Sequence, residues 1–406
     1  MPRSLRRFAW VLAAGCAGRG EPAPPAGFTA MASPSGARAA EPYLAVDPQG
    51  VLHMTWIERT GDSTAAVKYA RLRDSTWSPP TTIVERKDLF VNWADFPAVA
   101  IAPSGGLVVH WLQRSGAGTY AYDIRVARSA DAGQSWTAPQ VLHRDGRQAE
   151  HGFLTFWPGG GDTVHAAWLD GRHMEAGDGH GRGAMTVQST SIAGDGSLGA
   201  ELALDMRNCE CCQVNSALTA RGPVVVYRDR SEDEVRDIAI VRQVNGTWTP
   251  PAKVHDDGWQ IAACPVNGPA ITARGDTVVV AWFTGARDTA RVKVAWSVDA
   301  GATFGAPAVV DGGNPAGRVD VELLPDGSAA VSWLERVPPE AAEVRVRRAR
   351  RDGTLGAPMT VATTSGARAS GFPKLVQRGD DFVAAWTVPG DTARILLGRM
   401  PAKGLP

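Results

Sequence analysis

Four cysteines carry the most specific chemistry in this sequence. Cys209, Cys211 and Cys212 lie within four residues, and Cys264 opens a phrase similar to the one that Cys212 opens. The two phrases read CQVNSALTARG (212–222) and CPVNGPAITARG (264–275). An even number of thiols in an oxidising compartment favours disulfides. Two alternatives stay open, a thiolate site for Cu(I) or Zn²⁺ and redox chemistry of free or adjacent thiols.

Arginines and carboxylates form a second group that could do chemistry. Arginine forks suit carboxylates, phosphates or sulfates, and carboxyl groups cleave glycosidic bonds as acids or bases. The candidate ligand-binding residues are Arg172, Arg228, Arg230, Arg318, Asn215 and Asn267. The candidate catalytic acids or bases are Asp170, Asp229 and Glu335. The alternative is that these charges form ion pairs that hold long loops in place.

A repeated pattern accounts for the similarity of the two cysteine phrases. Short runs of alternating apolar residues end on an aromatic residue seven times, at positions 51 to 59 residues apart. These aromatic residues are Trp56, Trp111, Trp168, Tyr227, Trp282, Trp333 and Trp386. An apolar run precedes each phrase and further apolar runs follow it, with Gly or Asp turns between them. Such a period indicates a repeat architecture.

Four short strands per unit predict an all-β, seven-bladed β-propeller of four-stranded blades. A six-bladed sialidase propeller is the alternative, if one unit is degenerate. The seventh unit ends after its third strand, near Met400, so we expect a strand at 28–32 to complete it and close the ring. Each aromatic residue should pack between strands in the interior.

The propeller geometry predicts which loops share a face. Strands within a blade alternate in direction, so the loops that enter first strands and those that leave second strands lie on one side of the disc. Cys212 and Cys264 begin the first strands of adjacent units and should therefore lie side by side near the channel. The candidate arginines and carboxylates belong to the same face.

Two turns resemble a family motif. Residues 129–136 (SADAGQSW) and 297–304 (SVDAGATF) fit the Asp-box of sialidase-like (BNR-repeat) propellers. The resemblance covers roughly residues 41–400 and implies a fold rather than an activity. Sialidases also carry three arginines that clamp the substrate carboxylate, a tyrosine nucleophile with a glutamate partner, and an aspartate acid/base. This chain has no tyrosine after Tyr227 and lacks the Arg-Ile-Pro motif, so a sialidase mechanism of the usual kind is not expected.

The N-terminus resembles an export signal. Three arginines precede a short apolar stretch, and AAGC, ending at Cys16, resembles the lipobox of bacterial lipoproteins, whose cysteine is lipidated. We therefore expect a signal peptide (1–16), a flexible Pro- and Gly-rich tether (17–40) and the propeller (41–400). A plain secretory signal is the alternative. This organisation predicts a periplasmic or outer-membrane-anchored monomer that touches the membrane by a lipid anchor only.

The balance of 42 basic and 42 acidic residues gives no sign of a nucleic-acid partner. The sequence predicts binding of an anionic or glycan ligand at a face rich in cysteine and arginine. A glycan-acting hydrolase and a metal-handling envelope protein are the alternatives.

Overall fold

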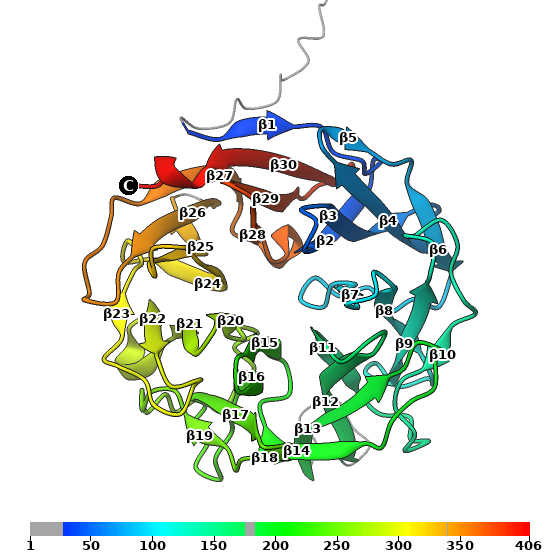
Figure 1. Cartoon of the computed structure of the whole chain (residues 1–406), viewed down its shortest axis with the longest axis horizontal. Coiled ribbons are helices and arrows are strands. Elements are labelled where there is room, and N and C mark those ends of the chain that lie inside the picture. Colours follow the sequence, from blue (N-terminus) through cyan, green and yellow to red (C-terminus); the bar gives the residue numbers. More distant parts are fainter. Residues whose placement is uncertain (1–26, 175–182, 339) are drawn as a thin grey trace, which may run out of the picture.

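The computed structural model describes residues 27–174, 183–338 and 340–406. The expected signal peptide, Cys16 and the first part of the expected tether lie outside these residues. The described chain forms seven antiparallel sheets arranged around a central axis (Figure 1). The prediction of a seven-bladed propeller is confirmed, and the six-bladed alternative is wrong.

The first three blades follow the chain from the N-terminal side. Blade I contains β2 (Ala39–Val46), β3 (Leu52–Arg59), β4 (Ala65–Arg73) and β5 (Thr76–Trp77), with β6 (Thr81–Arg86) also paired to β4. Blade II contains β7 (Val99–Ile101), β8 (Leu107–Arg114), β9 (Tyr122–Ser129) and β10 (Gln140–Val141). Blade III contains β11 (His151–Pro158), β12 (Val164–Met174), β13 (Gly183–Ile192) and β14 (Leu202–Asn208).

The next three blades repeat the same order. Blade IV contains β15 (Asn215–Thr219), β16 (Gly222–Arg228), β17 (Ile238–Val244) and β18 (Thr247–Trp248), with β19 (Ala252–Lys253) also paired to β17. Blade V contains β20 (Ala270–Arg274), β21 (Thr277–Thr284), β22 (Arg291–Ser297) and β23 (Ala308–Val309). Blade VI contains β24 (Pro315–Leu323), β25 (Ala329–Val337), β26 (Ala341–Ala349) and β27 (Met359–Ser365).

Blade VII joins the two ends of the described chain. It contains β28 (Lys374–Arg378), β29 (Asp381–Val388) and β30 (Arg394–Pro401), and β1 (Thr29–Met31) pairs antiparallel with β30 as its outermost strand. The ring therefore closes through the N-terminal strand, as the sequence predicts. The ordered chain reaches into the segment expected as a tether, since β1 and the start of β2 lie before residue 41.

Helix is scarce in the described residues. Three short 3₁₀ turns are present, η1 (Ala286–Asp288), η2 (Arg368–Ser370) and η3 (Ala402–Gly404). Among the described residues, no helix is long and apolar enough to cross a membrane.

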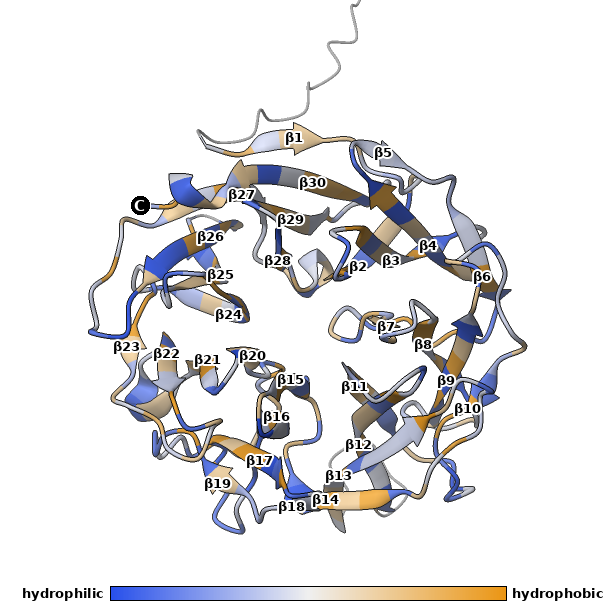
Figure 2. Cartoon of the chain, viewed as in Figure 1, coloured by the Kyte–Doolittle hydropathy of each residue, from blue (hydrophilic) through white to orange (hydrophobic). Residues whose placement is uncertain are grey.

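The blades are held together by the strand side chains that face one another. Hydrophobic residues lie along the strands, whereas hydrophilic stretches are frequent in the loops at the rim (Figure 2). All seven repeated aromatic residues are at most 5% exposed. Burial of a large apolar side chain stabilises a fold by about 1.5–3 kcal/mol, so this one position in each repeat makes a large contribution.

The two Asp-box-like turns have the same hydrogen bonds. Ser129 Oγ accepts from the Gly133 N–H at 2.8 Å, and Asp131 Oδ1 accepts from the Ser135 N–H at 2.9 Å. The turn at 297–304 repeats both bonds at the same distances. Glycine is favoured at the fifth turn position because the φ of Gly133 in the first turn is +87°.

Candidate functional site

The loops on one face of the disc carry the candidate site. This loop face comprises the connections between blades and those between second and third strands. Its longest described segments are 87–98, 142–150, 209–214, 229–237, 254–269 and 366–373. The two Asp-box-like turns join third to fourth strands and so lie on the opposite face.

Aromatic side chains crowd the axis at the loop face. Segment 87–98 lies inward, and the Trp93 ring stacks on Phe372 with centroids 5.7 Å apart. Phe96 stacks on Tyr43 at 5.6 Å, and the Lys374 Nζ lies 3.4 Å from the Phe96 centroid. These residues come from blades I and VII and from the loop that enters blade II. The aromatic cluster therefore connects the first and last blades of the chain.

Two arginines lie over the Trp93 ring, and a third, Arg336, is close enough to Arg318 to repel its charge. The Arg318 guanidinium lies over Trp93 at 4.9 Å, and that of Arg368 lies over the same ring at 5.9 Å. Burial, reinforced by repulsion from Arg336 and Arg368, lowers the pKa of Arg318 to about 10. Arg318 therefore keeps its charge at neutral pH. None of the ion pairs recorded for the described residues includes Arg318, Arg336 or Arg368.

Arg318 is the member of this cluster that the sequence pattern identified. Its Nη1 donates to Ser370 Oγ at 2.6 Å and to the Gly371 carbonyl at 3.0 Å. Arg336 and Arg368 were missed because Arg336 lies near the end of β25 and Arg368 in η2, two segments with no shared motif. Their proximity emerges only when blades VI and VII are placed around the axis.

The other candidate arginines already have partners within the protein. Arg172 forms ion pairs with Asp170 and Glu201. Arg228 is 1% exposed and donates only to the carbonyls of Asn267, Arg236 and Phe283. Arg230 pairs with Glu234 and Glu210. Arg318 likewise donates to Ser370 Oγ and to the Gly371 and Ala367 carbonyls, so all three members of the expected anion clamp of Arg172, Arg228 and Arg318 hold acceptors of the protein itself.

Two candidate carboxylates support buried tryptophans. Asp170 Oδ2 accepts from Trp168 Nε1 at 2.8 Å, and Glu335 Oε2 accepts from Trp333 Nε1 at 2.5 Å. Burial acts to raise the pKa of Asp170, but hydrogen bonds from Arg172 outweigh it and hold the pKa below its usual range. These contacts assign Asp170 and Glu335 a structural role, which the sequence pattern did not distinguish from catalysis.

The third candidate carboxylate, Asp229, has a different environment. It is half-buried beside Asp205 and Asp237, and its Oδ1 accepts from the Arg230 N–H at 2.7 Å. Burial raises the pKa of Asp229 to about 6, although this hydrogen bond opposes the rise. Its hydrogen bond is local, so Asp229 remains available for proton transfer.

A tyrosine–glutamate pair that the sequence did not reveal also lies on the loop face. The Tyr122 hydroxyl donates to Glu150 Oε1 at 2.7 Å. Burial, opposed by this hydrogen bond and reinforced by Asp95 and Glu210, raises the pKa of Glu150 to about 7. Tyr122 itself is fully buried beneath Phe90, at a centroid separation of 4.0 Å. Glu150 is half-buried and is the better placed of the two to exchange a proton with a ligand.

The candidate asparagines are structural connectors. Asn215 Nδ2 donates to the Pro269 carbonyl at 2.7 Å. The Asn267 carbonyl accepts from Arg228, and its Oδ1 accepts from the Arg318 N–H at 2.7 Å. Asn267 thus links two candidate arginines through hydrogen bonds of its own, and it is 7% exposed.

Three of the four described cysteines gather in the loop before β15, and the expectation that Cys212 and Cys264 lie side by side stays a prediction. The Cys209 Sγ lies 3.5 Å from that of Cys212 and 3.9 Å from that of Cys211. The Cys264 thiol interacts with that of Cys211. All four described cysteines are free thiols, so the expected disulfides are not formed in this structure. Their arrangement, three sulfurs together with a fourth beside them, is instead that of a ligand set.

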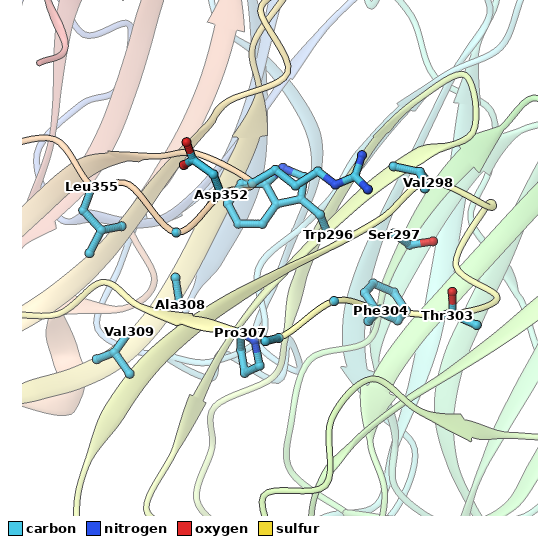
Figure 3. A pocket seen from close by; sticks show the side chains of 14 residues that line it. Trp296, Ser297, Val298, Thr303, Phe304, Pro307, Ala308, Val309, Asp352 and Leu355 are labelled. Carbon is cyan, nitrogen blue, oxygen red and sulfur yellow. The ribbon is translucent and has the colours of Figure 1, made fainter.

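One pocket lies away from this site. It has a volume of about 630 Å³ and lies between β22, β23 and the turn before β27, on the side of the Asp-box-like turns (Figure 3). Trp296, Phe304 and Pro307 line it, with Asp352 at its edge. Its lining is mixed polar and apolar and offers no cluster of titratable groups, so it is a poor candidate for catalysis.

Comparison with known proteins supports the fold. No family model matches the sequence, and no curated protein matches it significantly. A solved protein of unknown function from Dyadobacter fermentans DSM 18053 is 15% identical, with a TM-score of 0.53 over 93% of this chain and 98% of that one. The polysaccharide lyase Uly1 is 10% identical, with a TM-score of 0.52 over 89% and 90% of the two chains. The NanB sialidase from Streptococcus pneumoniae is 11% identical, with a TM-score of 0.49 over 91% and 69%. At these identities the first two likenesses show a shared fold.

Proposed function

We propose that the loop face binds an acidic glycan through Arg318, Arg336 and Arg368. The observation that carries this proposal is a group of three arginines, two of them over the Trp93 ring and the third beside Arg318, without a carboxylate partner among the described residues. Clustered arginines repel one another, and an anion between them relieves that repulsion through charge-assisted hydrogen bonds. A sugar carboxylate or sulfate is such an anion.

Two further observations favour a glycan over other anions. The turns at 129–136 and 297–304 resemble the Asp-box of sialidase-like propellers and share one hydrogen-bond pattern. The fold is also that of the polysaccharide lyase Uly1. Both are arguments from family and fold, so they support the class of ligand and leave the activity to the site residues.

Cleavage of the same glycan is a second candidate function. The pKa of Glu150, raised to about 7, is suited to accepting or donating a proton near neutral pH. The arginine cluster on the same face would neutralise a substrate carboxylate. Under this hypothesis the acid or base is Glu150 rather than Asp170 or Glu335, since those two carboxylates accept hydrogen bonds from tryptophan N–H groups.

The proposal includes a location. We propose that the chain acts outside the cytoplasm as a monomeric lipoprotein anchored at Cys16. The support is the resemblance of residues 3–16 to a lipoprotein signal.

The test is binding of sialyllactose and of glucuronic-acid oligosaccharides, measured by calorimetry. We expect binding that weakens with salt, and Arg368→Ala to weaken it tenfold or more, since a charge-assisted hydrogen bond contributes about 1.5–3 kcal/mol. The same samples are assayed for new reducing ends. If the chain is catalytic, Glu150→Gln abolishes their release while binding persists.

Arg351→Ala is the matched control, since Arg351 is an exposed arginine that lines the pocket on the opposite face. Equal binding of neutral lactose, or unchanged binding by Arg368→Ala, would show that the arginine cluster is not the ligand site.

A further inference from the structure

The cysteine cluster forms a site separate from the arginines around Trp93. We propose that Cys209, Cys211 and Cys212 bind one thiophilic metal ion, Zn²⁺ or Cu(I), with Cys264 as the fourth ligand. The thiolates are the chemistry that both ions share, since soft sulfur ligands select them over hard cations. The three sulfurs of the loop before β15 all lie within 4.8 Å of one another.

The sulfur spacing fits a shared metal ion. Ligands bonded tetrahedrally to zinc at 2.3 Å are separated by about 3.8 Å. The observed separations from the Cys209 Sγ are 3.5 Å to Cys212 and 3.9 Å to Cys211. A disulfide needs about 2.05 Å. Cys209 and Cys212 also have the Cys-x₂-Cys spacing of many zinc sites.

Hydrogen bonds hold the sulfurs in the orientation that a metal needs. Arg236 Nη1 donates to the Cys209 Sγ at 3.2 Å, and the Asn267 N–H donates to the Cys212 Sγ at 3.4 Å. Donors to a ligand sulfur stabilise its thiolate form and fix its position. The Arg236 donor is itself anchored by Glu210 at 2.9 Å, so this support is rigid.

The surrounding charges favour an anionic centre. Arg230 and Arg236 are balanced by Glu210 and Glu234 through four ion pairs. Arg228 is buried, donates only to carbonyls, and acts on the Cys212 thiol as a neighbouring positive charge. Four thiolates around a divalent ion carry two net negative charges. This negative charge compensates Arg228, which otherwise remains a buried cation without an anionic partner.

The site also has an open side. Cys209 and Cys212 are each 1% exposed, whereas Cys211 and Cys264 are half-buried. An ion can therefore reach the inner sulfurs past the outer pair. Binding displaces the thiol protons to solvent, so affinity should fall as the pH falls.

The test uses the full chain, reduced and stripped of metal under anaerobic conditions. Titration with Co²⁺ should give a thiolate-to-cobalt charge-transfer band that saturates at one ion per chain. Zn²⁺ should displace the Co²⁺. A parallel titration with Cu(I) in competition with a chromophoric chelator measures the affinity for Cu(I). Cys212→Ser should weaken binding at least about 100-fold. Metal loading should protect the four thiols from alkylation.

Cys211→Ser is the second variant, because Cys211 is partly exposed and its loss should leave the fold intact; circular dichroism and melting confirm folding of both. Cys211→Ser should bind the metal ion at least tenfold more weakly than the wild type does. The proposal is overturned if the reduced wild type binds all three ions no better than Cys212→Ser. A Cys209–Cys212 disulfide in protein isolated from its native location overturns it as well.

Discussion

One buried network balances its charges at the level of single side chains. Asp145 joins two stacked histidines, accepting from His143 Nδ1 at 2.7 Å and lying 3.3 Å from His151 Nε2. The two imidazole rings lie 3.6 Å apart. Asp123 approaches the other side of His143 at 3.5 Å. Burial acts to lower the pKa of His143, but the two aspartates raise it to about 9.

This network predicts a pH-dependent stability. The folded-state pKa of His143, about 9, lies above the value near 6.5 of an unfolded histidine. The His143 interaction therefore contributes fully below about pH 6.5 and is lost as the pH rises through about 9. We expect the wild type to lose on the order of 2 kcal/mol of unfolding free energy between pH 6.5 and 9.5 relative to His143→Gln. Urea unfolding at several pH values measures this difference.

His173→Gln, at an exposed histidine, is the control. Parallel profiles of unfolding free energy against pH for the wild type and His143→Gln would contradict the assignment.

The sequence predicted which residues could do chemistry. It did not predict which of their side chains are already hydrogen-bonded to other groups of the protein. A pattern that went unused was Trp-x-Asp or Trp-x-Glu. Among the seven repeated aromatic positions it occurs at Trp56, Trp168 and Trp333, and in each of these three cases the acid accepts the indole N–H. Recurrence in equivalent repeats indicates a structural role, so this signal could have removed Asp170 and Glu335 from the catalytic candidates. Tyr122 and Glu150 carry no such local signal, because they meet only across adjacent blades.

At the scale of elements, closure of the ring depends on the short strand β1. Phe28, immediately before it, is 4% exposed and packs in the cluster that contains Phe382, Trp386 and Met400. Without β1, the edge of β30 would be open, and an unpaired edge invites aggregation. The three residues of β1 therefore close the ring and cover the edge of β30, although the strand is short.

We predict that Phe28→Ala lowers the unfolding free energy by about 3 kcal/mol, because it leaves a cavity where the first and last strands meet. Thr29→Ala, at an exposed position of β1, should change it by less than about 0.5 kcal/mol. Chemical denaturation of the three proteins gives both values. Equal stability of Phe28→Ala and the wild type would show that blade VII holds without this closure.

The strands were predictable because their signal is repeated seven times. Each unit has alternating apolar residues and one buried aromatic residue, so a weak local pattern gains weight with each copy. The boundary at residue 41 was less certain, since the Pro- and Gly-rich composition of 17–40 conceals a three-residue strand. A strand that short is identified by its partner β30 rather than by its own sequence.

At the scale of the whole molecule, the proposed ligand and metal sites lie apart from the proposed membrane anchor. Loops from all sectors converge on the loop face, where the arginine cluster and the cysteines lie close to the axis. β1 lies instead at the outer rim, outside β30 (Figure 1). An anchor that precedes β1 would therefore hold the disc by its edge. Cys16 lies 13 residues before Thr29, and an extended chain of that length spans at most about 45 Å.

This arrangement predicts that anchoring and ligand binding are independent. We propose that Cys16 is lipidated, so the wild type should take up labelled palmitate and sediment with membranes. Cys16→Ser should lose the label and move to the soluble fraction, yet its affinity for the acidic oligosaccharides should stay within twofold, because the rim is remote from Arg318 and Trp93. An inhibitor of the lipoprotein signal peptidase should reproduce accumulation of the unprocessed chain. Unlabelled wild-type protein in the soluble fraction would contradict the anchor, whereas a joint loss of anchoring and binding in Cys16→Ser would contradict the separation of rim and loop face.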